Sequence, residues 1–140
     1  MKRFLSSLLI IFLLSINAYA YQVETIDKNA YFFINGEFKG KDAPVKGVFD
    51  INIEEGKIKE IKTVIPEYGD VAKYDPTEWD IISNNNGNIL ATRLSETGQD
   101  LLCFRSDGKY YLVQNFFVDK DSGISPGQYT SLFFGEYTKK

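Results

Sequence analysis

The sequence predicts an all-β protein in which a single antiparallel meander closes into a small β-barrel. Turn signals recur along the chain at Gly36, Gly56, Gly87 and Gly108, each followed by one polar and then one apolar residue. Two of the three intervals between these glycines are 20 and 21 residues, which fits a pair of strands with their turns. No segment after residue 20 has the pattern of a long amphipathic helix.

A closed sheet is expected because several of the strands are apolar on both faces. Residues 110–113 (YYLV) and 116–118 (FFV) place large side chains on alternate sides of the chain. One open sheet cannot bury both faces, so these segments indicate a barrel or, as the alternative, a two-sheet β-sandwich. Short links between successive hairpins favour the barrel, and an eight-stranded barrel has room for one small ligand.

The first hairpin is predicted at Asn35-Gly36, because both residues adopt the positive φ that a type I′ turn requires. The next strand, residues 48–53, alternates apolar and polar residues and therefore buries one face. Residues 58–65 also fit a helix, but the run KTVI favours a strand. A bulge near Lys59-Glu60 would then turn Ile61, Thr63 and Ile65 inward. Further strands are expected at residues 80–83, 89–94, 100–105, 109–118 and 129–137.

Residues 1–20 have the three parts of a cleaved export signal, and residues 21–140 form one all-β domain. Lys2 and Arg3 precede seven apolar residues, 8–14, and Ala18-Tyr19-Ala20 places small residues at the cleavage site. A permanent anchor would need about 20 apolar residues. Residue 21 is Tyr, so no cysteine stands there to accept a lipid. We expect a bacterial protein of the periplasm or cell exterior that does not span a membrane after cleavage.

The composition excludes several classes of function. Without Lys2 and Arg3 the chain has 14 basic and 19 acidic residues, a balance that argues against binding to nucleic acid or anionic lipid. The absence of histidine removes Ser-His-Asp and Cys-His catalysis and histidine-based metal sites. We therefore expect no cofactor and no enzymatic activity, with carboxylate acid/base chemistry as the remaining catalytic alternative.

The candidate ligand site is the segment 66–80, PEYGDVAKYDPTEWD, which is about ten residues longer than the other connections. Its aromatic residues and acids resemble a surface that packs on apolar carbons and accepts hydroxyl hydrogen bonds. The candidate ligand-binding residues are Tyr68, Tyr74, Trp79, Asp75 and Glu78. In the structural alternative, Trp79 begins a strand and fills one end of the barrel while the acids are solvated.

Two further features receive a structural interpretation. Asp119 and Asp121 precede Gly123 with the spacing of a calcium loop, but the remaining acidic ligands are missing, so an ordinary polar turn is favoured. Cys103, the one cysteine, lies before the turn at Asp107-Gly108 and faces Leu112 or Tyr111 according to the length of that turn. Either register gives apolar surroundings, which predicts an unreactive packing residue.

Two functions of different classes remain. The first is an exported, non-catalytic binding protein whose barrel holds a small apolar or amphipathic molecule. The second is a protein-interaction module, such as an enzyme inhibitor or a component of a surface assembly, that uses loops or an edge strand.

Overall fold

The computed structural model describes residues 20–41, 45–65, 69–70, 72, 77–123 and 125–140. The export signal predicted for residues 1–20 lies outside these residues, except for Ala20. No helix in the described part of the chain is long and apolar enough to cross a membrane. The strands are β1 Ala20–Ile34, β2 Glu37–Lys41, β3 Lys46–Asn52, β4 Lys57–Ile65, β5 Gly69–Asp70, β6 Glu78–Asn85, β7 Asn88–Leu94, β8 Gly98–Phe104, β9 Lys109–Val118 and β10 Gly127–Lys139.

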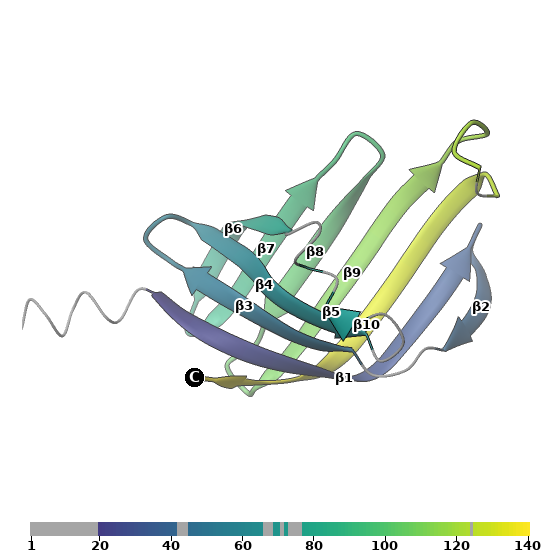
Figure 1. The fold of residues 1–140 in the computed structure, drawn as a ribbon. Helices are drawn as coiled ribbons and strands as arrows, with labels where there is room; N and C mark the ends of the chain where they lie inside the picture. The colour runs from purple at the N-terminus through teal and green to yellow at the C-terminus, as the bar shows by residue number, and fades with distance from the viewer. Residues whose placement is uncertain (1–19, 42–44, 66–68, 71, 73–76, 124) are drawn as a thin grey trace, which may run out of the picture.

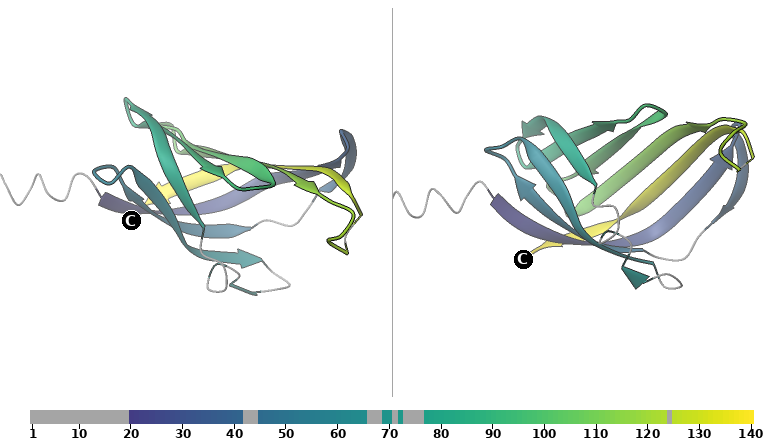
Figure 2. Two further views of the ribbon diagram at one scale, coloured as in Figure 1. Left: turned by 90° about the horizontal axis from the view of Figure 1, so that it is seen from above. Right: turned by 45° about the horizontal axis from the view of Figure 1, so that its top comes forward.

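The strands form the predicted antiparallel barrel. Hydrogen-bonded neighbours run in the order β1-β3-β4-β6-β7-β8-β9-β10, and β10 pairs again with β1, which closes an eight-stranded ring. The two short strands lie off this ring, β2 beside the far end of β1 and β5 beside the far end of β4. Figures 1 and 2 show the strands curving around a common interior, with the end of β10 close to the start of β1.

A bulge in β1 allows this long strand to serve two neighbours on one edge. Residues 20–26 pair with β3, and residues 31–34 pair with β2, while β10 follows the other edge. The pairing with β10 shifts between Asp27 and Asn29. Before the shift, Val23 and Asp27 face the interior, and after it Ala30 does. An extra residue bends a strand in this way and changes which side chains point inward.

The local predictions for the turn at Asn35-Gly36 and for β4 are largely confirmed. Asn35 and Gly36 both have positive φ, 54° and 80°, as a type I′ turn requires. Residues 57–65 are a strand with a register shift, in which Phe49 of β3 pairs with Glu60 and Val48 with Lys62. Ile61 is therefore the extra residue and is 41% exposed, so the expectation that it faces inward is wrong.

A packed aromatic core fills one half of the barrel. Trp79, the second residue of β6, is 2% exposed and packs edge-on against Phe49, which also contacts Phe104. Phe104 stacks on Tyr110 and meets the edge of Tyr137. These rings pack with aliphatic residues from β1, β3, β4, β7 and β8, namely Val23, Ile51, Ile58, Ile89, Ala91 and Leu102. Trp79 therefore lies at the start of a strand and fills part of the barrel interior, as the structural alternative predicted.

Cys103 lies outside this core. It pairs with Tyr111, the register expected for the longer turn, and is half-buried on the outer face of β8. Burial raises the pKa of its thiol, and the nearby Arg105 guanidinium opposes that shift. The expected apolar surroundings are therefore only partial, because its neighbours Leu102 and Phe104 take the inward positions.

Candidate ligand-binding cavity

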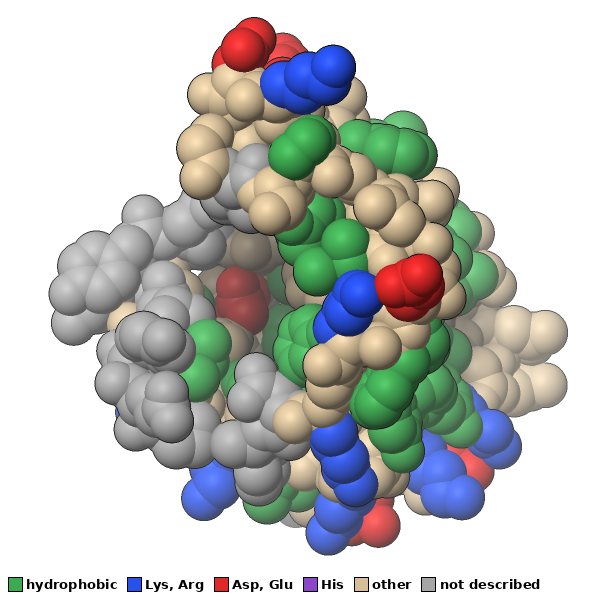
Figure 3. Space-filling model, turned by 90° about the vertical axis from the view of Figure 1, so that its right-hand side faces the viewer, with side chains coloured by type: hydrophobic (Ala, Val, Ile, Leu, Met, Phe, Trp, Pro, Cys, Tyr) green, Lys and Arg blue, Asp and Glu red, His purple; other side chains and the backbone are tan. Residues whose placement is uncertain are grey.

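The other half of the barrel is hollow. It forms a cavity, open to the solvent, of about 480 Å³, within the range of about 300–1,000 Å³ that is usual for small-molecule sites. Figure 3 looks into a hollow on this face, with hydrophobic and acidic side chains on its walls. The described residues that line the cavity are Thr25, Asp27, Phe32, Val45, Gly47, Phe49, Glu60, Thr63, Ile65, Ala72, Thr77, Tyr110, Leu112, Gln114 and Phe133.

The wall is built from inward positions of β1, β3, β4, β9 and β10. Leu112 of β9 pairs with Phe133 of β10, and Phe133 meets the ring of Phe32 edge-on at a centroid distance of 5.9 Å. Phe49 and Tyr110 line the cavity and also belong to the packed core, so they separate the hollow half from the filled half. Because these side chains are fixed by neighbouring strands, the cavity is present without any rearrangement of the sheet.

Asp27 is the more deeply buried of the two carboxyl groups of the described wall, with 4% of its surface exposed. The bulge of β1 begins at this residue, and the Asp27 backbone N–H donates to the Val45 carbonyl at 3.0 Å. Burial raises the pKa of the Asp27 carboxyl from 3.8 to about 7, and a hydrogen bond with the Val45 backbone acts in the opposite direction. An uncompensated carboxylate inside an apolar cavity is costly, so the carboxyl holds its proton to a higher pH than usual.

A second carboxyl, that of Glu60 on β4, lies on the same wall. It accepts a hydrogen bond from the Thr63 hydroxyl, while the Glu60 backbone N–H donates to the Thr77 carbonyl at 2.8 Å. On β1 the Thr25 hydroxyl oxygen accepts the backbone N–H of Gly47, a residue of β3, at 3.1 Å. The cavity is therefore mainly apolar with a few fixed polar groups, the usual composition of a small-molecule site.

The segment 66–80 contributes to the cavity through residues other than those predicted. One Asp70 carboxylate oxygen accepts the backbone N–H groups of Thr63, at 3.1 Å, and of Ala72, at 3.2 Å. These bonds hold the segment against β4. Ala72 and Thr77 then line the cavity, and Ala72 is buried. Among the described residues of the segment, Ala72 and Thr77 thus lie at the cavity.

Of the predicted ligand-binding residues, the structure describes Trp79 and Glu78. Tyr68, Tyr74 and Asp75 lie outside the described residues. Trp79 packs in the filled half, and Glu78 is exposed, with its carboxylate 3.1 Å from the Lys57 ammonium. Neither of these two belongs to the described cavity wall.

The calcium-like loop has the contacts of a polar turn. The Asp119 carboxylate accepts the backbone N–H of Asp121 at 3.1 Å, and its carbonyl accepts the Ser122 hydroxyl at 3.0 Å. Within the described residues no three acids or cysteines gather as a metal site would require.

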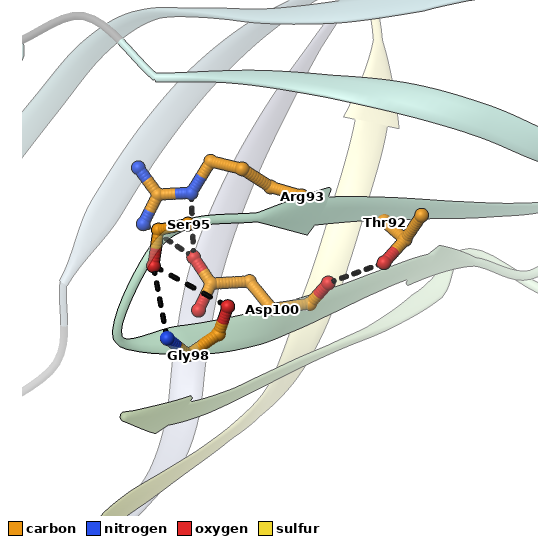
Figure 4. A network of polar contacts seen from close by, with 5 residues as sticks. All are labelled: Thr92, Arg93, Ser95, Gly98 and Asp100. Atoms are coloured by element: carbon orange, nitrogen blue, oxygen red, sulfur yellow. Dashed lines mark hydrogen bonds and ion pairs between the residues drawn. The ribbon is translucent and has the colours of Figure 1, made fainter. Parts of the chain in front are cut away.

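A partly buried ion pair between Arg93 of β7 and the buried Asp100 of β8 borders the same interior (Figure 4). The Asp100 carboxylate accepts from Nε of Arg93 at 2.9 Å and from Nη2 at 2.6 Å. The Arg93 guanidinium also lies 5.9 Å from the centre of the Trp79 ring. Asp100 pairs across β8 and β9 with Gln114, a residue of the cavity wall. The charge of Arg93 is therefore matched locally by Asp100.

Sequence analysis missed Asp27 and Glu60. In the run VETIDK, Ile26 attracts attention as the apolar residue, yet it is exposed and Asp27 is buried. The signal that could have identified Asp27 is the number of charged residues on each of the two faces of this strand. Val23, Thr25 and Asp27 carry one charge, whereas Glu24, Ile26 and Lys28 carry two, so the first face is the better candidate for the interior.

The outer surface carries a band of aromatic side chains over β2, β1, β10 and β9. Phe38 is 59% exposed and contacts the rings of Tyr31 and Phe33, and Tyr31 contacts Phe134. Phe134 in turn contacts Tyr111 at a centroid distance of 5.5 Å. An exposed aromatic band of this kind is typical of surfaces that contact other molecules.

No known protein family, curated protein or solved structure matches this chain.

Proposed function

We propose that this chain is an exported, non-catalytic binding protein that holds a small apolar or amphipathic molecule inside its barrel. The observation that carries the proposal is the cavity of about 480 Å³, lined by aromatic rings and a small number of polar groups. A barrel that folded for stability alone would fill this space with side chains, as its other half does. The pattern of residues 1–20 supports the exported location.

The test compares variants that fill the cavity with variants of the outer face. β4 and β9 lie opposite each other in the ring of eight strands, so the double variant Thr63→Trp/Leu112→Trp reduces the cavity from two sides. The control is Lys62→Trp/Val113→Trp, which places the same side chains at the neighbouring outward positions of the same strands. Binding is measured by titration with the neutral dye phenylnaphthylamine, whose fluorescence rises in apolar surroundings.

We expect the wild-type chain and the control to bind the dye, and the cavity variant to bind it at least about tenfold more weakly, since it removes much of the buried contact area. Native mass spectrometry of protein purified from its natural source, without refolding, then identifies the bound molecule. Equal dye binding by both double variants would contradict a ligand inside the barrel.

The second candidate function is a protein-interaction module, which the exposed aromatic band on β1, β2, β9 and β10 favours. This function predicts that the cavity variant retains the partner, while substitution of Phe38 and Phe33 by Ser releases it. Co-purification from the natural source with each variant distinguishes the two functions.

A further inference from the structure

The charges around the cavity are unbalanced. Asp27 and Glu60 are carboxylic acids, Tyr110 is the one phenol, and no lysine or arginine belongs to the wall as far as the structure describes it. The cations of the adjoining strands lie elsewhere. Lys28, on β1, is on the outer surface 3.4 Å from the Glu136 carboxylate, and Lys46, at the start of β3, is exposed.

Arg93, a cation that borders the interior on β7, is also unavailable to a ligand. Both Nε and Nη2 of Arg93 donate to one Asp100 carboxylate oxygen, so this guanidinium is already paired. The Glu60 carboxylate has one partner in Thr63, which leaves further acceptor positions on its oxygens. The described wall therefore offers hydrogen-bond acceptors and negative charge to a bound molecule.

The aromatic rings of the wall add to this preference. Phe32, Phe49 and Phe133 come from three different strands, and each lines the cavity. The face of an aromatic ring carries partial negative charge and attracts a cation that lies over it. Rings and carboxyl groups together form surroundings that suit an apolar molecule with a positive end.

We propose that the natural ligand is an apolar molecule bearing a protonated amine or quaternary ammonium group, with the Asp27 carboxylate as its counter-ion and Glu60 as a second acceptor. This inference rests on the proposed function, because it names the class of ligand for the same cavity. A fatty acid or another anion is disfavoured, since its carboxylate would meet the buried Asp27, the half-buried Glu60 and no described cation.

The protonation of Asp27 gives the proposal a signature in pH. Burial places the pKa of Asp27 at about 7 in the empty protein, and a bound cation stabilises the charged form and lowers that pKa. Binding of a permanently charged cation must then displace a proton from Asp27 below this pH. Its affinity is expected to fall by about tenfold for each pH unit below 7 and to level off above it.

The test uses three probes that share one alkyl chain, namely octyltrimethylammonium, octanol and octanoate. Their dissociation constants are measured by displacement of phenylnaphthylamine from the full mature chain. The variants are Asp27→Asn and Glu60→Gln, and the control is Asp50→Asn, which removes an exposed carboxylate on the outer face of β3. Thermal unfolding confirms that each variant is folded.

We expect octyltrimethylammonium to bind at least about tenfold more tightly than octanol near pH 8, and octanoate to bind most weakly. Asp27→Asn should lower the affinity for the cation by about tenfold or more, abolish its pH dependence and leave octanol unchanged. Asp50→Asn should behave as the wild type.

Two different failures are distinguishable. If the dye and octanol bind but the cation has no advantage, or if Asp27→Asn leaves the cation's affinity and pH profile unchanged, the ligand class is wrong while the barrel remains a binding protein. If neither the dye nor any of the three probes binds, the proposed function is itself refuted.

Discussion

Replacing Asp27 by Asn is expected to stabilise the protein at neutral and alkaline pH. The substitution keeps the size of the side chain and an acceptor for the hydrogen bond with the Val45 backbone, but removes the charge. Because the pKa of Asp27 is raised in the folded chain, the folded state binds more protons than the unfolded state between about pH 4 and pH 7. The stability of the wild-type protein therefore falls as the pH rises through this window.

The size of the effect follows from the difference between the two pKa values. The shift from 3.8 to about 7 is roughly three units, and each unit corresponds to about 1.4 kcal/mol, so the limit above pH 7 is about 4 kcal/mol. The cavity beside Asp27 reduces this limit wherever water reaches the carboxylate. We expect Asp27→Asn to gain about 2–4 kcal/mol near pH 8 and close to zero near pH 4.

Urea unfolding at several pH values measures this gain, and Trp79 is a convenient reporter because it is the sole tryptophan and is buried in the core. The matched control is Asp50→Asn, the same change on the exposed face of β3, which should stay within about 0.5 kcal/mol of the wild type. A constant difference between wild type and Asp27→Asn at all pH values, or a loss of stability near pH 8, would refute the assignment of Asp27 as a buried acid of raised pKa.

Three further predictions concern the packing of the barrel. Gly135→Ala should lower the free energy of unfolding by about 2–4 kcal/mol, because the new Cβ would lie 2.1 Å from the Ile26 carbonyl oxygen. The control Gly40→Ala should be nearly neutral, because a Cβ there has nothing within 4 Å. Urea unfolding measures both variants. Arg93→Ala should cost about 2 kcal/mol or more, since it leaves the Asp100 carboxylate buried and unpaired, while Arg105→Ala breaks an exposed pair and should cost under about 1 kcal/mol. Equal losses of unfolding free energy in the two arginine variants would contradict the burial of the Asp100 carboxylate. Cys103 should react with iodoacetamide more slowly in the folded protein than in urea, because burial raises the pKa of its thiol, and mass spectrometry of timed samples follows the reaction.

The sequence was sufficient for the fold class and for most of the strands, although it predicted neither β5 nor the first half of β1. β9 has the predicted bounds, 109–118, because its start is fixed by the turn at Gly108 and its large apolar residues continue to Val118. The closed sheet also followed from the apolar residues on both faces of this strand. These features depend on local conformational preference and on the need to bury both faces of a strand. Both can be recognised from residues that are adjacent in the sequence.

The cavity could not be located from the sequence, since it depends on where two bulges fall. The shift at Asp27–Asn29 in β1 and the extra residue Ile61 in β4 decide which side chains point inward beyond those positions. A bulge depends on the partner strand, and the pairing of β1 with β10 joins opposite ends of the chain. Among the described residues of the segment 66–80, Ala72 and Thr77 line the cavity, whereas Trp79 belongs to the packed core.

The pairing of β1 with β10 also has a consequence for how the chain folds. These are the first and last strands of the ring, and their register pairs run from Val23–Lys139 to Ile34–Tyr129. Contacts of such high sequence separation carry the largest loop-closure entropy, so this seam should form late. Until it does, β1 and β10 present unpaired edges that can pair with strands of other molecules. Refolding should therefore lose yield as protein concentration rises, and a chain shortened before Gly127 should aggregate rather than form a smaller barrel.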